Sequence, residues 1–194
     1  MLSLEKMRFA TREQLQRLHQ LGSDRNALKI LVEMKEYLQV KTHEGRNVYY
    51  LSAKGREVIG VEDEIKWSLQ VDHHLLRNDM YLFYQCPDDW RTEEKVSFKY
   101  KNGLTYKETS LVPDATFTAY NTYYFLEVDR TQSMAENKKK IKQYALLSPA
   151  IEAQYQTKPV LVFYTTTESR KSVLEKFCKE VGLQHKVYSK EDLR

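Results

Sequence analysis

Apolar residues in the N-terminal part of the chain recur at spacings of three and four, which predicts two consecutive helices. The first spans residues 11–21, with leucines along one side: Leu15, Leu18 and Leu21. Gly22 interrupts this pattern, and Ser23 is a suitable N-cap for a second helix over residues 24–38. The second helix is expected to bury one apolar side: Ala27, Leu28, Leu31, Met34 and Leu38.

A β-hairpin is predicted directly after these helices. Val40 and residues 48–51 read as two short strands. Between them lies a polar segment, residues 42–47, with Gly45 where a tight turn needs a glycine. Residues 52–57 then return to a helical pattern.

The order of helix, turn, capped helix and hairpin is that of a winged helix-turn-helix domain, which we assign to residues 1–60. The run Tyr-Tyr-Leu-Ser-Ala-Lys-Gly over residues 49–55 resembles the segment that leaves the wing in many bacterial winged-helix proteins. In this class the second helix enters the major groove of DNA and the wing contacts the adjacent backbone. The candidate DNA-binding residues are polar side chains of the helix and the wing: Ser23, Arg25, Asn26, Lys29, His43, Arg46 and Asn47.

The distribution of charge supports a nucleic-acid partner for this part of the chain. Residues 1–60 contain 11 basic and 7 acidic residues, whereas residues 61–194 contain 20 of each, so the net charge of +4 lies in the first segment. Arginine and asparagine can read base edges, and Lys29 and Arg46 are expected to meet phosphates. The alternative is that these are ordinary solvated residues of a domain that dimerises or binds protein.

The rest of the chain, residues 61–194, alternates between helical and strand patterns. The predicted elements are helix 61–84, strands 96–100, 111–117 and 123–129, helix 133–147, strand 160–164, helix 168–181 and strand 186–188. Turn residues at 102–103 and 120–122 separate the first three strands. This order describes a restriction-endonuclease-like α/β domain, so the whole chain is expected to be α+β.

Carboxylates occur where two of these strands come together. Asp114 follows a proline on the second strand, and Glu127 and Asp129 end the third. Because they are two residues apart, Glu127 and Asp129 project from one face of the strand. Magnesium and manganese ions prefer carboxylate oxygens as ligands. Carboxylates in this arrangement usually hold a metal ion that assists the cleavage of a phosphodiester. Glu94, just before the first strand, is the candidate fourth ligand.

These residues resemble the motifs of the PD-(D/E)xK nuclease superfamily. The Pro-Asp pair at Asp114 matches the first motif, and Glu127 matches the acid of the second. The resemblance implies a lysine at the position of Asp129, and this chain departs from it. Lys140 and Tyr144 are similar to the Gln-x-x-x-Tyr element of the RecB-like branch, which implies that Lys140 replaces the missing lysine. The alternative is that this lysine-rich helix is a solvated or phosphate-facing surface.

The combination of features resembles the replication-relaxation family over about residues 7–165. It comprises the winged helix, a helix with His73, Asn78 and Asp79, the Pro-Asp pair, a Glu-x-Asp-Arg-Thr run over residues 127–131 and the lysine-rich helix ending in Tyr144. These proteins are encoded by plasmids and other mobile elements and are implicated in their replication or in DNA relaxation. The Glu-x-Asp pattern of this family implies that an aspartate at position 129 is usual among its members.

Two functions follow as expectations. The first is a DNA-binding protein of a plasmid or mobile element whose second domain is an endodeoxyribonuclease dependent on Mg or Mn. The second is a non-enzymatic transcriptional regulator or replication accessory factor with a degenerate nuclease fold. The expected partners are double-stranded DNA, plasmid replication proteins and a second copy of the chain.

A cytoplasmic location is expected from what the sequence lacks. No apolar run of signal-peptide or membrane-spanning length is present. The two cysteines, Cys86 and Cys178, lie far apart without a metal or redox motif, which fits a reducing compartment.

Overall fold

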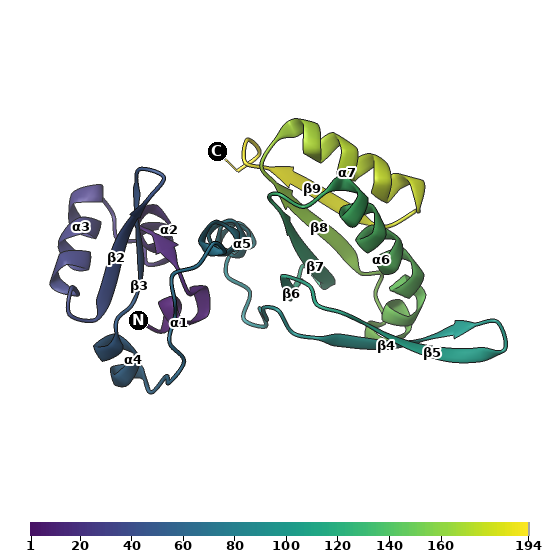
Figure 1. Ribbon diagram of the computed structural model, residues 1–194, viewed down its shortest axis with the longest axis horizontal. Coiled ribbons are helices and arrows are strands. Elements are labelled where there is room, and N and C mark those ends of the chain that lie inside the picture. Colours follow the sequence, from purple (N-terminus) through teal and green to yellow (C-terminus); the bar gives the residue numbers. More distant parts are fainter. Residues whose placement is uncertain (194) are drawn as a thin grey trace. The chain divides into compact units, whose positions relative to one another are not determined.

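The computed structural model describes residues 1–193, with the backbone alone at residues 101, 102 and 155, and has a mixed α+β architecture (Figure 1). The chain forms two compact units, Met1–Leu82 and Phe83–Arg194. The division falls within helix α5 (Val71–Phe83), whereas the sequence predicted a boundary at residue 60.

The first unit places helices around a small antiparallel sheet. Its elements before α5 are α1 (Leu2–Met7), β1 (Ala10–Thr11), α2 (Arg12–Leu18), α3 (Asp24–Glu33), β2 (Leu38–His43), β3 (Arg46–Leu51) and α4 (Ala53–Ile59). The strand order is β1-β3-β2, with Val48 of β3 opposite both Thr11 and Lys41. Figure 1 shows β2 and β3 as a long hairpin that follows α3.

Local capping explains where the helices of this unit begin. Thr11 and Gln14 form a reciprocal capping box at α2, and the Ser23 side chain accepts a hydrogen bond from the Asn26 backbone at α3. The helices end earlier than predicted, α2 at Leu18 and α3 at Glu33.

Two residues expected on the buried side of the second helix are placed differently. Leu38 belongs to β2, where it pairs with Leu51 across the sheet. Leu28 is exposed, because it is rotated away from the buried side formed by Ala27 and Leu31.

Residues 61–70 do not continue the predicted helix 61–84; the helix begins only at Val71. Trp67 in this segment instead packs against the buried cluster that includes Val48 and Val71. Asn78 of α5 donates hydrogen bonds to the carbonyls of Met7 at 3.1 Å and Phe9 at 2.6 Å. These tertiary contacts attach α5 to the first unit and move the division beyond residue 60.

The second unit combines a hairpin with a mixed sheet. Its elements are β4 (Val96–Asn102), β5 (Thr105–Leu111), β6 (Ala115–Ala119), β7 (Thr122–Asp129), α6 (Met134–Tyr155), β8 (Val160–Thr165), α7 (Glu168–Glu180) and β9 (His185–Ser189). The larger sheet has the order β6-β7-β8-β9, in which β6 is antiparallel to β7 while β8 and β9 follow in parallel. Strands β4 and β5 pair only with each other in the named sheets.

Two elements of this unit differ from the sequence prediction. The predicted strand 111–117 is divided between β5 and β6. Pro113, which has no backbone N–H for a sheet ladder, lies at the division. Helix α6 passes through Pro149 instead of ending at residue 147, and its residues Leu147 and Ile151 are both fully buried in the core.

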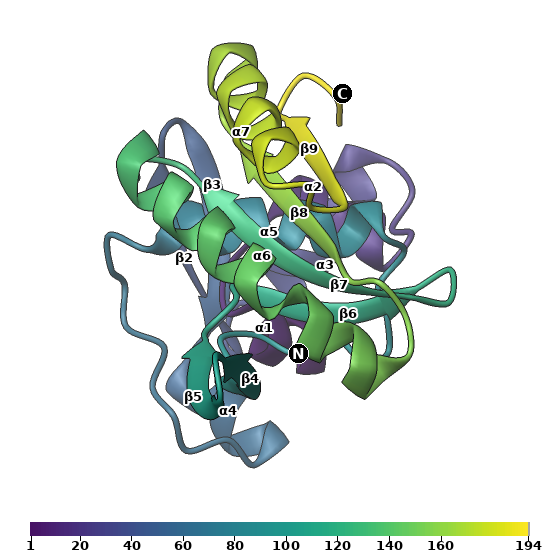
Figure 2. The same ribbon diagram turned by 90° about the vertical axis from the view of Figure 1, so that its right-hand side faces the viewer.

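Figure 2 shows α6 and α7 on the same face of the larger sheet. The core beneath these helices includes Phe125, Leu161, Phe163, Ile141 and Leu174. Side chains alternate along a strand, so Glu127 and Asp129 share this covered face with Phe125. None of the described helices combines the length and the apolar character needed to cross a membrane.

Candidate functional site

Glu127 lies two residues before the end of β7 and is only 2% exposed. Lys140 Nζ lies 2.5 Å from its Oε2, and the Tyr144 hydroxyl donates to its Oε1 at 2.6 Å. Both partners come from one side of α6, because residues four apart in a helix share a face. The structure therefore brings Lys140 and Tyr144 to Glu127.

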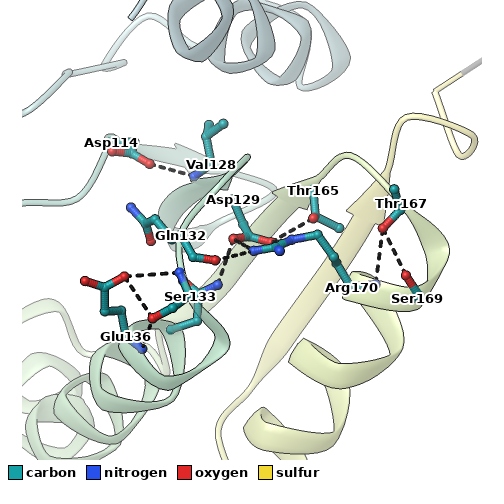
Figure 3. A network of polar contacts seen from close by, with 11 residues as sticks. Asp114, Val128, Asp129, Gln132, Ser133, Glu136, Thr165, Thr167, Ser169 and Arg170 are labelled. Carbon is teal, nitrogen blue, oxygen red and sulfur yellow. Dashed lines mark hydrogen bonds and ion pairs between the residues drawn. The ribbon is translucent and has the colours of Figure 1, made fainter. Parts of the chain in front are cut away.

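Asp114 completes this group from the segment before β6. Its backbone N–H donates to the Leu126 carbonyl at 3.0 Å, and its Oδ2 accepts a hydrogen bond from the Val128 backbone at 2.6 Å (Figure 3). These two bonds place Asp114 beside Glu127, with which it interacts electrostatically. We define Asp114, Glu127, Lys140 and Tyr144 as the Glu127 site.

The electrostatics of the Glu127 site favour a proton or another cation on Glu127. Burial, followed by the nearby charge of Asp114, raises the pKa of Glu127 to about 8, although Lys140 and Tyr144 oppose this shift. Burial lowers the pKa of Lys140, but the Glu127 carboxylate outweighs this effect and the pKa is raised overall. Burial, followed by the charge of Glu127, raises the pKa of Tyr144 well above its usual value.

The donor set of this site fits a divalent metal. Asp114 and Glu127 supply carboxylate oxygens, the ligand type that Mg²⁺ and Mn²⁺ prefer. A divalent cation between them would relieve the repulsion that raises the pKa of Glu127. The site has two acids, however, where the sequence predicted four.

Asp129 is fully buried at the end of β7, within a network of its own (Figure 3). Arg170 donates to both of its oxygens at 2.7 and 2.6 Å, Thr165 donates at 2.8 Å and Asn137 at 2.7 Å. Burial tends to raise the pKa of Asp129, but these hydrogen bonds, Arg170 first, outweigh it and lower the pKa. We call Asp129, Arg170, Thr165 and Asn137 the Asp129 network.

The Asp129 network joins four elements, β7, β8, α6 and α7, at one end of the sheet. Thr165 ends β8 directly opposite Asp129, and Asn137 and Arg170 come from the first turns of α6 and α7. Arg170 also donates to the Gln132 carbonyl at 2.6 Å. The geometry gives Asp129 a structural role, and its partners were not identified from the sequence, because their positions depend on the register between β7 and β8.

Glu94, the predicted fourth ligand, is exposed and forms an ion pair with Arg91 at 3.6 Å. Within the described residues, neither Glu94 nor Asp129 joins Asp114 and Glu127 in a group of three potential metal ligands. One group of three does occur there, in the first unit: His43, Glu44 and Asp72, with ligand atoms within 4.8 Å of one another.

The candidate DNA-binding residues of the first unit differ in the hydrogen bonds and ion pairs that their side chains form. The six on which the prediction rested are all exposed: Ser23, Arg25, Asn26, Lys29, Arg46 and Asn47. Three of them serve local structure. The Ser23 hydroxyl caps α3, the Asn26 side chain donates to the Leu21 carbonyl at 2.7 Å, and Asn47 accepts from Thr42 at 3.3 Å.

The remaining candidates carry positive charge. Lys29 is 3.9 Å from Glu33, a long and exposed ion pair, and Arg25 and Arg46 lie at the surface. His43 at the hairpin tip is bound to Asp72 of α5 at 2.7 Å, so the hairpin tip is fastened to the body of this unit.

Comparison with known protein families identifies the family of this chain. The replication-relaxation family matches residues 1–161, so the chain belongs to this family. Membership supports a role in the replication or relaxation of a plasmid or another mobile element. No match was found among curated proteins.

Among solved structures, protein VC1899 from Vibrio cholerae is similar, with 12% sequence identity and a TM-score of 0.43. The similarity covers 89% of this chain and 42% of that protein, so this chain spans less than half of its length.

Proposed function

We propose that the protein binds duplex DNA of a plasmid or mobile element and cleaves it as an endodeoxyribonuclease dependent on Mg²⁺ or Mn²⁺. The observation that carries this proposal is the convergence of Asp114 from the segment before β6, Glu127 from β7 and Lys140 from α6. The bonds from Val128 to Asp114 and from Lys140 and Tyr144 to Glu127 hold these groups together.

Each residue of the Glu127 site has a role in this reaction. Asp114 and Glu127 would hold the metal, which when bound activates water and stabilises charge on the phosphate. Lys140, whose side chain is 28% exposed, brings positive charge to the solvent side of the site and attracts the phosphodiester. Tyr144 fixes the orientation of the Glu127 carboxylate through its short hydrogen bond.

The first unit supplies DNA binding as a winged helix in this proposal. Support comes from the order α2, α3, β2, β3 and from the pairing of the short strand β1 with β3. Helix α3 would enter the major groove with Arg25 and Lys29, and Arg46 on the hairpin would contact a neighbouring phosphate.

Nicking of supercoiled plasmid in the presence of Mn²⁺ tests the proposed nuclease. The unmodified protein is expected to nick the plasmid, and Asp114→Asn is expected to lose this activity. Glu94→Gln is the matched control, because it also removes one carboxylate charge but lies on an exposed side chain paired with Arg91. The control variant should nick at the unmodified rate.

A second candidate function is a replication accessory factor that binds DNA without cutting it. The specific observation in its favour is that Asp129, at the position where the nuclease superfamily has lysine, is fully occupied by Arg170, Thr165 and Asn137. Salt-dependent DNA binding without nicking would support this function and refute the nuclease. Nicking that persists in Asp114→Asn would also refute the assignment of the Glu127 site.

A further inference from the structure

The second unit carries a β-ribbon that is attached to its core at one end only. Residues 95–111, which include β4 and β5, form this ribbon, and we call it the arm. In Figure 1 the arm runs outward from the end of α6, beyond the larger sheet of the same unit. The turn at its tip is tight, with Gly103 at a φ of 62°, so the two strands stay paired to the end.

The base of the arm is fixed to the helix that carries the candidate catalytic residues. Phe98 and Leu111 are buried in the same core cluster as Ile141 and Tyr144 of α6. Gln143 of α6 also donates to the Ser110 carbonyl at 3.1 Å. The arm and the Glu127 site therefore share one rigid support.

Beyond Tyr100, which still packs against the core, the arm leaves the core. From Tyr100 to Gly103 there are three residue steps, or about 10 Å at about 3.4 Å per residue. Lys99 and Lys107 are exposed on the arm, Leu104 at the tip is fully exposed and Tyr106 is 74% exposed. Large apolar side chains at the end of a ribbon are available to a partner and contribute nothing to the core.

The arm also holds the excess charge of its unit. Residues 83–194 contain 18 basic and 15 acidic residues, a net charge of +3. The arm alone contains four lysines and one glutamate, which is also a net charge of +3, so the rest of the unit is neutral. The first unit, residues 1–82, has 13 basic and 12 acidic residues and a net charge of only +1. With the division after residue 82, most of the positive charge of the chain lies on the arm.

We propose that the arm is a second DNA-binding element, which lies in a groove of duplex DNA with Lys99 and Lys107 on phosphates and its apolar tip against the bases. A two-stranded ribbon fits the major groove, which is about 12 Å wide and 8.5 Å deep, and apolar side chains can contact the thymine methyl groups there. This inference rests on the proposed function, since it adds a contact to the same DNA.

A short segment of the chain connects the arm to Asp114, so DNA bound by the arm would lie at a fixed position relative to the Glu127 site. Strand β5 ends at Leu111, and Asp114 follows three residues later. A duplex held by the arm is thereby fixed with respect to the Glu127 site, independently of how the two units are placed. The arm orients the substrate, and the first unit supplies a separate point of attachment.

A second copy of the chain is the competing occupant, because both edges of the isolated ribbon have backbone groups that could pair with another strand. Lysines along such an edge disfavour strand pairing, and the net charge of +3 repels an identical arm. The same charge attracts a polyanion, which is why duplex DNA is the better match.

Fluorescence anisotropy with a labelled duplex of random sequence, measured over a range of salt concentrations, tests the lysines. Lys99→Gln/Lys107→Gln is expected to weaken binding about tenfold at low salt and to reduce the salt slope by about 1.8, or about 0.9 per phosphate contact. Lys176→Gln/Lys190→Gln removes the same charge from exposed positions of the same unit outside the arm and should change neither quantity appreciably.

Two further variants distinguish the contribution of the apolar tip to DNA binding from the contribution of the charge of the arm. Leu104→Ser/Tyr106→Ser should weaken binding several-fold and leave the salt slope unchanged, because no phosphate contact is lost. Glu108→Gln, which removes the acidic residue opposite Lys99 in the strand register of the ribbon, should strengthen binding a few-fold. All these positions are exposed, so urea unfolding should show unmodified stability.

The outcomes distinguish the arm from the proposed function. If the unmodified protein shows no salt-dependent affinity, both ideas fail. If it binds DNA, and Arg46→Gln weakens binding while the arm variants do not, only the arm is refuted. A shift from dimer to monomer in the arm variants, with DNA affinity unchanged, would also refute it in favour of the second copy.

Discussion

Two carboxylates on the same strand, two residues apart and on the same face, have opposite environments in this protein. Asp129 receives hydrogen bonds from Arg170, Thr165 and Asn137, and its pKa is lowered. Glu127 is equally buried, lies near the like charge of Asp114, and its pKa is raised to about 8. The sequence pattern Glu-x-Asp gives no reason to distinguish the two carboxylates, whereas their hydrogen bonds and neighbouring charges make their pKa values differ.

The difference shows which acid is available for chemistry. Burying an ionised carboxylate costs several kcal/mol unless donors and a cation compensate for it. At Asp129 the compensation is complete within the fold, so a metal would have to displace Arg170. At Glu127 it is incomplete, so binding a proton or a divalent cation lowers the energy of the site. A buried carboxylate with a perturbed pKa beside a second acid is a candidate functional site.

Among the substitutions, the largest expected effect comes from removing the cation beside each carboxylate. Arg170→Met leaves Asp129 buried without its main partner and should lower the free energy of unfolding by about 3 kcal/mol. Lys140→Met should cost only about 1 kcal/mol, because Glu127 can become protonated and keeps its bond from Tyr144. Urea unfolding at pH 7 measures both. Equal losses would show that the two carboxylates do not differ in the way described.

The dependence of stability on pH should have opposite signs at the two sites. Glu127 binds its proton more tightly in the folded state, so its contribution is complete below pH 4 and is lost as the pH rises towards 8. The loss is about 1.4 kcal/mol per pH unit within that window. Asp129 has a lowered pKa, so its contribution is present at neutral pH and is lost as the pH falls below about 4.

Glu127→Gln isolates the first of these effects. The variant cannot titrate at this position, so the difference between its unfolding free energy and that of the unmodified protein should change between pH 5 and pH 8. A constant difference over this range would mean that the pKa of Glu127 is not raised.

Features set by neighbouring residues could be predicted from the sequence. Ser23 caps the helix that follows it, because a cap depends on the next three residues only. The two-residue spacing of Glu127 and Asp129 and the four-residue spacing of Lys140 and Tyr144 correctly predicted shared faces. The winged helix and the nuclease fold that these elements suggested stay predictions.

Features set by distant contacts could not be predicted. Thr165 and Arg170 lie 36 and 41 residues beyond Asp129, and only the parallel register of β7 and β8 brings them together. The helix predicted over 61–84 was wrong at residues 61–70 for the same reason, since Trp67 packs against the cluster that includes Val48 and Val71 and does not extend α5. The sequence therefore identified the acids and missed the residues that make them different.

Manganese should stabilise the folded protein through Asp114 and Glu127. At a free concentration ten times its dissociation constant, Mn²⁺ should raise the free energy of unfolding by about 1.4 kcal/mol. The gain should be larger at pH 8.5 than at pH 6.5, because the metal competes with the proton on Glu127. Thermal unfolding with and without Mn²⁺ measures this effect without reference to activity.

Matched variants test whether the metal binds at Glu127, beside Asp114, or at Asp129. Asp114→Asn should abolish the gain from Mn²⁺. Thr165→Val, which removes one donor from Asp129, should keep the gain although the protein starts from a lower stability. A gain that is lost in Thr165→Val and kept in Asp114→Asn would place the metal at Asp129.

The smallest effect concerns α6, the helix that serves both carboxylates. Ser133 caps it through a reciprocal bond pair with Glu136, and Ser133→Ala should lower the free energy of unfolding by about 1 kcal/mol. Loosening the first turn disturbs Asn137 at the Asp129 network, whereas Lys140 and Tyr144 lie further along the helix and should stay in place. The pH dependence assigned to Glu127 should therefore be unchanged in this variant. A changed pH dependence would show that α6 transmits strain between the two sites, and that the two environments are a single coupled unit.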